Sequence, residues 1–347
     1  SGNRVLVYTQ GIRLENQQFG DEHGLGISDN GVESIEVIKG PASLLYGSDA
    51  LGGVLYINPE KFAKENDTEI LASSRFYSNT LGNNSSLAIK TSTDNWKFLA
   101  RGTNAFHSDY KIPTDQRITN TRFKEKDLKL GVGFGKTNFS SELRYNFNNS
   151  KLGIPEEGIG EQSTNTDLLE PFQNIDNHTI SLHNHIFFGN SKLDIDLGYT
   201  FNDRQEFEEH HEEEGEEEEV VRLEIEQTRY DMRAELNDIS DHIDMLRWSL
   251  AYTDYEHVEL EGGEVGTQWR RESWENRLEL RHNPWQGWQG VMGLQIQFSE
   301  LEAVGDESYI PESDTHNYGV FLVESYESGD WIYELGARLD NSSIDTV

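Results

Sequence analysis

The chain has 347 residues, and its 63 acidic and 29 basic side chains give a net charge of −34. This acidic excess argues against a nucleic-acid-binding protein, because phosphate recognition needs a positive surface. The chain has no cysteine, so disulfides and thiolate ligands are excluded and a metal would need His, Asp, Glu or backbone oxygen. The charge itself fits either a cationic partner or a well-solvated surface.

Hydrophobic residues make up 35% of the chain, and no apolar run approaches the roughly 20 residues that a membrane helix needs. A membrane-spanning β-strand needs only about 9–11 residues, of which alternate ones touch lipid. A β-barrel therefore stays possible at this composition. The chain starts at Ser1 in polar sequence without a visible signal peptide, so we expect the start of an exported protein to be missing or processed.

Residues 1–65 are predicted to form a small mixed α/β unit. Residues 32–38 alternate between apolar and polar types, which predicts a strand with one buried face. Pro41 then opens and Gly47 closes a predicted short helix. The pair Gly52-Gly53 leads into a second predicted strand, residues 54–57.

Residues 66–347 follow a pattern of strand, turn and strand without an amphipathic helix. In residues 193–202, for example, Leu, Ile, Leu, Tyr and Phe share one face, while Asp, Asp, Gly, Thr and Asn share the other. This alternation alone also fits a soluble sandwich. Thirteen strands are predicted, at residues 68–79, 84–92, 95–106, 125–136, 138–149, 177–189, 191–205, 222–236, 243–257, 269–282, 287–300, 315–327 and 330–341.

The connections between these strands alternate in length. Short turns alternate with longer polar connections, which are predicted at residues 107–124, 150–176, 206–221, 258–268 and 301–314. Short turns on one side and long loops on the other are typical of an outer-membrane barrel. Aromatic residues near strand ends fit its interfacial girdles, namely Trp96, Trp248, Trp285, Trp288 and Trp331. Bacterial single-chain barrels have even strand numbers and no open edge, so thirteen strands predict an incomplete barrel.

Residues 32–57 carry the pattern E-x-I-E-V-x-x-G-P followed by Y-G-x-x-x-x-G-G-V-x-x-I. This pattern resembles the plug-domain motif of the TonB-dependent outer-membrane receptors. The resemblance assigns a packing role, without chemistry, to six residues: Gly40, Pro41, Tyr46, Gly47, Gly52 and Gly53. The glycines permit tight turns where a narrow lumen leaves no room for side chains.

The resemblance implies a mainly β protein, a transmembrane antiparallel β-barrel of about 22 strands with an α/β plug in its lumen. Residues 1–65 would be the C-terminal part of an incomplete plug, and residues 66–347 the N-terminal part of the barrel. The implied location is the outer membrane of a Gram-negative bacterium, in contact with lipid. The implied partner is the TonB energy-coupling complex, which contacts a more N-terminal segment in family members. The implied function is active import of a scarce nutrient.

The first candidate for cargo binding is the segment of Asp21, Glu22 and His23. The sequence around it resembles the zinc-uptake branch of the family, and carboxylate with imidazole is a donor set for zinc and similar metals. The alternative is a polar loop without a ligand. No permanently bound cofactor is expected, with zinc or another divalent cation as cargo.

The second candidate is the acidic run of residues 206–219, with Glu209, His210, His211 and Glu212 at its centre. Such a run is either a weak collector of divalent cations or a solvated acidic loop. His107 begins another long connection and is a further candidate ligand. His183 and His185 share one strand face, predicted to face the lumen, where they either extend a transfer path or pack against the plug.

Three other functions compete with metal import. A ferric siderophore or haem receptor would use aromatic and basic lumen residues such as Trp269, Arg270 and Arg271. A passive porin would lack the plug, and a soluble acidic β-protein would merely buffer cations. No nucleophile elbow, phosphate loop or zinc-hydrolase helix is present, so the sequence gives no support for an enzyme.

Overall fold

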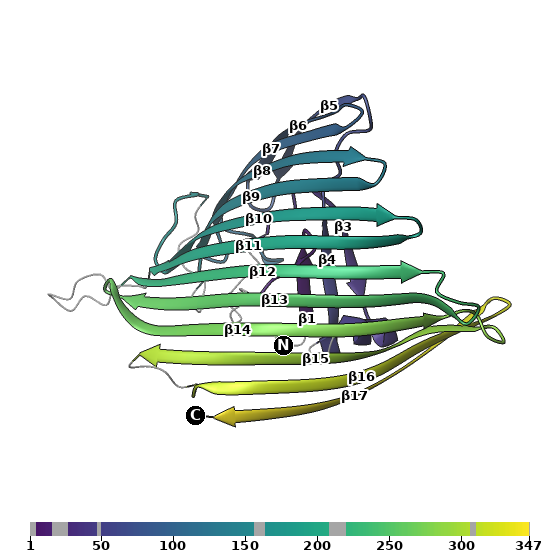
Figure 1. The fold of residues 1–347 in the computed structure, drawn as a ribbon. Coiled ribbons are helices and arrows are strands. Elements are labelled where there is room, and N and C mark those ends of the chain that lie inside the picture. The colour runs from purple at the N-terminus through teal and green to yellow at the C-terminus, as the bar shows by residue number, and fades with distance from the viewer. Residues whose placement is uncertain are drawn as a thin grey trace.

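The computed structural model describes residues 5–15, 27–46, 50–155, 164–207, 220–305 and 310–346. These residues form two separate sheets, a small one near the N-terminus and a large one that contains the rest of the chain. None of the helices in these ranges is long and apolar enough to cross a membrane. The small sheet lies behind the large one in Figure 1.

The small sheet has the strand order β2-β1-β4-β3. Its strands are β1 (Val5–Thr9), β2 (Ile12–Arg13), β3 (Val32–Ile38) and β4 (Gly53–Pro59). Strands β1 and β4 run parallel, and the other neighbours are antiparallel. Two short cores of apolar side chains hold the sheet together, one of Leu6, Ala50 and Val54 and one of Val7, Leu14 and Ile57.

The strand predicted at residues 32–38 is confirmed, but the helix that follows it differs from the prediction. It is a 3-10 helix, η2 (Gly40–Tyr46), and a second one, η3 (Ala50–Gly52), leads into β4. The described part of this unit is therefore β-sheet with 3-10 turns instead of mixed α/β. Position 53 of the motif requires glycine, because φ there is +111° and an added Cβ would lie 2.6 Å from the carbonyl oxygen of Ile38.

The large sheet has thirteen antiparallel strands in sequence order, with β5 and β17 at its edges. The strands are β5 (Thr68–Tyr77), β6 (Gly82–Ser92), β7 (Trp96–His107), β8 (Phe123–Lys136), β9 (Phe139–Gly153), β10 (Phe172–Phe188), β11 (Ser191–Phe207), β12 (Val221–Asn237), β13 (Ile243–Glu261), β14 (Glu264–His282), β15 (Trp288–Gly305), β16 (Ser313–Ser328) and β17 (Trp331–Thr346).

All thirteen predicted strands are present, and most are longer than predicted at the end with the long connections. One predicted connection is wrong. Residues 258–268 are not a long loop, because β13 and β14 continue to a two-residue turn at Gly262 and Gly263. Both glycines have positive φ, which is the geometry that closes a tight hairpin. The polar composition of this segment had suggested a loop, although its residues pair across the strands.

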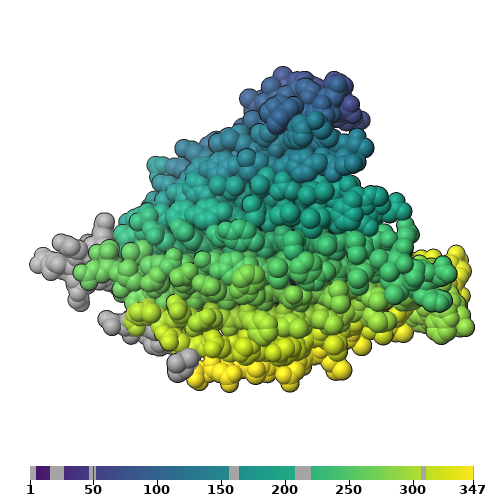
Figure 2. Space-filling view, in the orientation of Figure 1, coloured from purple at the N-terminus to yellow at the C-terminus, as the bar shows by residue number. Residues whose placement is uncertain are grey.

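The polarity of the large sheet is inverted relative to a soluble protein. Its exposed side chains include many large apolar ones, such as Leu128, Leu130 and Val132 on β8. The residues between them are polar, and Asp127 is buried on the other face of the same strand. An apolar face toward lipid and a polar face toward the lumen are what a membrane barrel requires. Figure 2 shows the outward face, along which the strands run side by side.

Short turns and long connections lie at opposite ends of the strands, as the sequence predicted (Figure 1). The predicted tryptophans gather at the short-turn end. Trp96 and Trp331 each begin a strand at that end, and their exposed fractions are 47% and 69%. Exposed tryptophans in this position fit an interfacial girdle.

Candidate functional site

The small sheet contacts the lumen face of the large sheet through the β1–β2 hairpin. The turn at Gln10 and Gly11 has positive φ at both residues. The side-chain oxygen of Gln10 accepts a hydrogen bond of 2.7 Å from the hydroxyl of Ser181 on β10. Ile12 packs against Gly198 on β11, where an added Cβ would lie 2.5 Å from the Ile12 side chain. The wall of the lumen therefore lacks a side chain where the hairpin lies closest.

A network of charges surrounds the base of this hairpin. Arg13 lies 3.9 Å from Glu275 on β14, and Arg229 on β12 lies 3.6 Å from the same carboxylate. Arg229 also forms two hydrogen bonds, of 2.8 and 2.9 Å, with Asp231. Tyr8 lies next to this network, and its burial raises the pKa of its hydroxyl. The charges on the two sheets balance one another, as buried ionic groups require.

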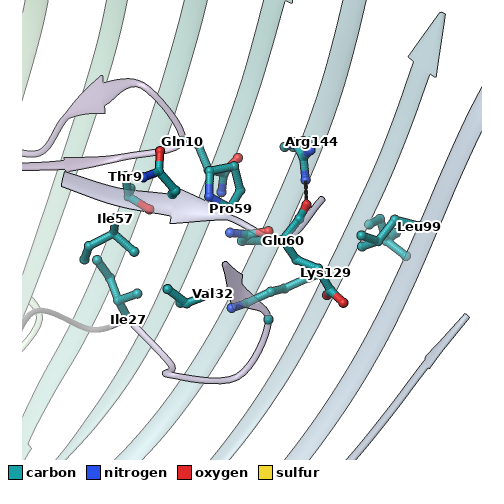
Figure 3. Close-up of a pocket in the computed structure, with 14 residues that line it drawn as sticks. Thr9, Gln10, Ile27, Val32, Ile57, Pro59, Glu60, Leu99, Lys129 and Arg144 are labelled. Carbon is teal, nitrogen blue, oxygen red and sulfur yellow. Dashed lines mark hydrogen bonds between the residues drawn. The ribbon is translucent and has the colours of Figure 1, made fainter. Parts of the chain in front are cut away.

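The end of β4 is fixed to the barrel wall by a second charged cluster, which we call the Glu60 latch. Figure 3 shows three of its residues, Glu60, Lys129 and Arg144. The Glu60 carboxylate accepts hydrogen bonds of 2.6 and 2.7 Å from Arg101 on β7, and it lies 3.6 Å from the ammonium of Lys90 on β6. The backbone oxygen of Glu60 accepts a bond of 3.0 Å from Arg144 on β9. Lys129 on β8 donates to the backbone oxygen of Asn30 in the plug unit. The latch thus joins β6, β7 and β9 to Glu60, while β8 is joined to Asn30.

The pKa of Glu60 lies below its ordinary value. Burial alone would raise this pKa, but the hydrogen bonds and the charge of Arg101, with Lys90 and Lys129 behind it, outweigh the burial. Glu60 is therefore a carboxylate at neutral pH. Next to it, Phe62 packs below the guanidinium of Arg144, whose centre lies 4.5 Å from the ring centroid.

Two adjoining cavities lie between the two sheets. One is lined by the end of β4, the latch residues and the β1–β2 turn, and Figure 3 shows how its side chains converge. The other is lined largely by polar groups, including Ser28, Asp127, Asn148 and Asn177. Asp127 is 6% exposed, and one of its carboxylate oxygens has no hydrogen-bond partner within the described ranges. The gap between the sheets is thus polar at this point, with the carboxylate of Asp127 and the ammonium of Lys129 in its lining.

Most of the predicted ligands lie outside the described residues: Asp21, Glu22, His23, Glu209, His210, His211 and Glu212. Gly47 of the plug motif also lies outside them. Within the described ranges, no three His, Asp or Glu side chains come together as a group that could hold a metal. Metal ligation by these seven residues stays a prediction.

The side chain of His107 is held by hydrogen bonds and ring stacking within the wall. Its two ring nitrogens lie 2.7 Å from the Thr80 hydroxyl and 2.7 Å from the Asn84 side-chain oxygen, and its ring stacks on Phe123. The side chain is buried, and an added Cβ at Gly82 would lie 2.3 Å from the ring. Metal ligation by His107 would require the loss of one of these hydrogen bonds, so the geometry favours packing at the base of the connection.

Of the remaining motif residues, Pro41 contacts the wall, while Tyr46, Gly40 and Gly52 are described by their places within the plug unit. Tyr46 packs edge-on against Tyr8, with ring centroids 5.8 Å apart. Pro41 lies against Gly336 of β17, where an added Cβ would lie 2.9 Å from the proline. Gly40 has a φ of +71° and begins η2. Gly52 ends η3, immediately before β4.

His183 and His185 do share the lumen face, as predicted. His183 lies against Gly11 of the plug and 2.9 Å from Asp196, and His185 lies 2.7 Å from Asp194. The basic residues named for a rival cargo are split between faces. Arg271 reaches Glu15 of the plug on the lumen side, whereas Arg270 pairs with Asp254 on the outward side.

The latch residues were not identified from the sequence. Glu60, Arg101, Lys129 and Arg144 are far apart in the chain, and each sits at an ordinary position of its strand or linker. The one available indication was the parity of the strands, since alternate residues of β7, β8 and β9 share a face. Only the register between strands shows that Arg101 reaches the Glu60 carboxylate while Arg144 and Lys129 reach the backbone oxygens of Glu60 and Asn30.

Residues 1–54 match the family model described as the TonB-dependent Receptor Plug Domain. The matched residues form the small sheet up to the start of β4, and this sheet lies against the polar face of the large sheet.

The chain is similar to one transporter in sequence and to two others in fold. A segment of 57 residues is 40% identical to the vitamin B12 transporter BtuB of Photobacterium profundum, and it covers 16% of this chain and 9% of that protein. The fold is similar to that of the copper transporter OprC, with a TM-score of 0.76, 14% identity, and coverage of 98% of this chain and 55% of that one. The fold is also similar to that of the ferric citrate transporter FecA, with a TM-score of 0.71 and 14% identity. That similarity covers 91% of this chain and 50% of FecA. The chain spans about half the length of these two structures.

Proposed function

We propose that the protein actively imports a scarce nutrient across the outer membrane, driven by the TonB complex. The observation that carries this proposal is the plug sheet against the lumen face, held there by the hairpin contacts and the Glu60 latch. A passive porin needs an open lumen, so a plug fixed by buried ion pairs argues for gated passage. Residues 1–65 would act as the plug and residues 66–347 as the barrel wall.

We further propose a divalent metal ion, such as zinc, as cargo. The support is the donor set of Asp21, Glu22 and His23, together with the acidic run around His210 and His211. The polar cavity between plug and wall adds one further oxygen donor, the unpartnered carboxylate oxygen of Asp127. Weak binding by the acidic run would raise the local cation concentration, and the segment around His23 would bind more tightly before plug movement releases the ion.

The second candidate cargo is an iron chelate. The names of similar proteins include transporters of copper, ferric citrate and vitamin B12, so the fold is compatible with several cargo classes. The split of Arg270 and Arg271 between faces leaves one arginine of that pair on the lumen side, and that arginine is in contact with plug residue Glu15. This placement weakens the case for an anionic chelate at that position.

The test is calorimetric titration of the complete, detergent-purified transporter with zinc, copper and nickel. His23→Ala is the test variant, and His242→Ala is the matched control because His242 is an exposed histidine in the short turn between β12 and β13. Tight binding of one ion that is lost only in His23→Ala supports metal import. An absence of saturable binding to any of the three ions refutes the metal cargo and leaves the iron chelate.

A further inference from the structure

Three lysines gather on the outward face of the large sheet, at the end with the long connections. Lys124 and Lys126 are on β8, and Lys151 is on β9 directly opposite Lys124. All three line one hollow, together with Phe106, Phe172 and residues of the following connection. We call this group the lysine cluster. It stands out in a chain with 63 acidic and only 29 basic side chains.

The cluster lies immediately beyond the lipid-facing band. Lys124 and Lys126 have the same strand parity as Leu128, Leu130 and Val132, whose exposed fractions are 38–40%. A residue two positions along a strand is about 6.6 Å away, so Lys126 lies at the margin of the apolar band. The ammonium groups are therefore placed where lipid headgroups begin, with their aliphatic stems over the apolar surface.

Among the residues that the structure describes, the lysines have few carboxylate partners. Like charges directly opposite each other on neighbouring strands destabilise a sheet, and Lys124 and Lys151 are such a pair. Within the described ranges, the one ion pair of the cluster joins Lys124 to Asp167, at 3.2 Å, and the Asp167 side chain is 77% exposed. Glu125 also lines the hollow, but it belongs to the other face of β8 by parity.

On β12 to β15, at the same end of the sheet, the outward face carries negative instead of positive charge. On β12 to β15 the outward residues beyond the apolar band are mainly acidic, namely Glu224, Glu226, Asp254, Glu256, Glu272 and Glu302. The arginines among them are neutralised by carboxylates, as Arg222 is by Asp203 at 2.8 Å and Arg270 by Asp254 at 3.5 Å. An anion that approaches β12 to β15 is therefore repelled, whereas β8 and β9 attract it.

We propose that the lysine cluster binds the phosphate headgroup of an anionic lipid of the outer leaflet. A phosphate between Lys124 and Lys151 turns their repulsion into two charge-assisted hydrogen bonds, and Lys126 supplies a third donor. The acyl chains then lie along Leu128 and Leu130 below the headgroup. This site is separate from the cargo path, since it lies on the opposite face of the wall.

The test uses the complete transporter in detergent, titrated with diphosphoryl lipid A and followed by native mass spectrometry. The variant is Lys124→Gln with Lys126→Gln and Lys151→Gln. The matched control removes three positive charges at the short-turn end, as Lys64→Gln with Lys97→Gln and Lys136→Gln, all exposed. We expect the first variant to bind the lipid about 10- to 100-fold more weakly and the control to bind it as the parent does.

Two further arms identify the ligand chemistry. The dephosphorylated lipid should bind the parent and the cluster variant equally, and inorganic phosphate at millimolar concentration should not displace the lipid. Equal lipid binding by parent and cluster variant overturns the proposal, and so does displacement by inorganic phosphate, which would indicate a plain anion site. The readout involves no cargo, so it is independent of the calorimetric test of metal import.

Discussion

The Glu60 latch gives the sharpest test of how the plug is held. In Glu60→Ala, Arg101 loses a two-bond partner while both side chains are only 10% exposed in the parent. Removing one partner of a buried ion pair costs about 3–5 kcal/mol, because the other charge stays buried without compensation. Since about 1.4 kcal/mol corresponds to a factor of ten, the opening equilibrium of the plug edge should shift by about 100- to 4000-fold.

Hydrogen exchange of the β4 amides in the complete transporter measures this shift, because exchange from a locally opened state follows the opening equilibrium. The control is Glu33→Ala. Glu33 pairs with Lys61 at 2.8 Å, but these side chains are 38% and 76% exposed, and exposed pairs contribute about 0–1 kcal/mol. Exchange from β4 should therefore change less than about sixfold in the control.

A double variant separates loss of the pair from loss of packing. Replacing both partners, as Glu60→Leu with Arg101→Met, removes the uncompensated charge and should recover most of the protection, since buried pairs often tolerate apolar replacement. If Glu60→Ala leaves β4 exchange within the range of the Glu33→Ala control, the latch does not hold the plug edge and the reasoning fails.

Three more outcomes follow from the same contacts. Because the folded-state pKa of Glu60 lies below its ordinary 4.5, the latch stabilisation should be complete above about pH 4.5 and lost as the pH falls through the lower folded-state value; β4 protection that increases on acidification would contradict this. Gly198→Val should destabilise the plug by about 1–3 kcal/mol through its clash with Ile12, whereas Gly102→Ala, which meets no atom within 4 Å, should not; denaturant unfolding of both variants is the check. His107→Ala should lower the unfolding midpoint, because two hydrogen bonds are lost, and leave zinc affinity unchanged; a loss of zinc binding would show that the histidine is a ligand after all.

The sequence by itself determined the strands, their alternation and the plug. Period-two patterning specifies where a strand lies and which residues share a face, so all thirteen strands of the wall were predictable. The motif of residues 32–57 was recognisable because tight turns in a narrow lumen restrict the residue types at fixed spacing. The lengths of the strands could not all be predicted. Residues 258–268 belong to β13, β14 and the turn at Gly262 and Gly263, because polar residues pair across a hairpin as well as apolar ones do.

The tertiary structure decided which of these faces meet and what they share. Alternation on β8 marks Lys129 and Asp127 as one face, but it does not say whether that face meets lipid, water or the plug. The register of four strands places Arg101 and Lys90 at the Glu60 carboxylate and Arg144 at the backbone oxygen of the same residue, and a shift of one residue would move each of them to the lipid side. The same register sets Lys124 opposite Lys151, because cross-strand neighbours are defined only when two distant segments pair.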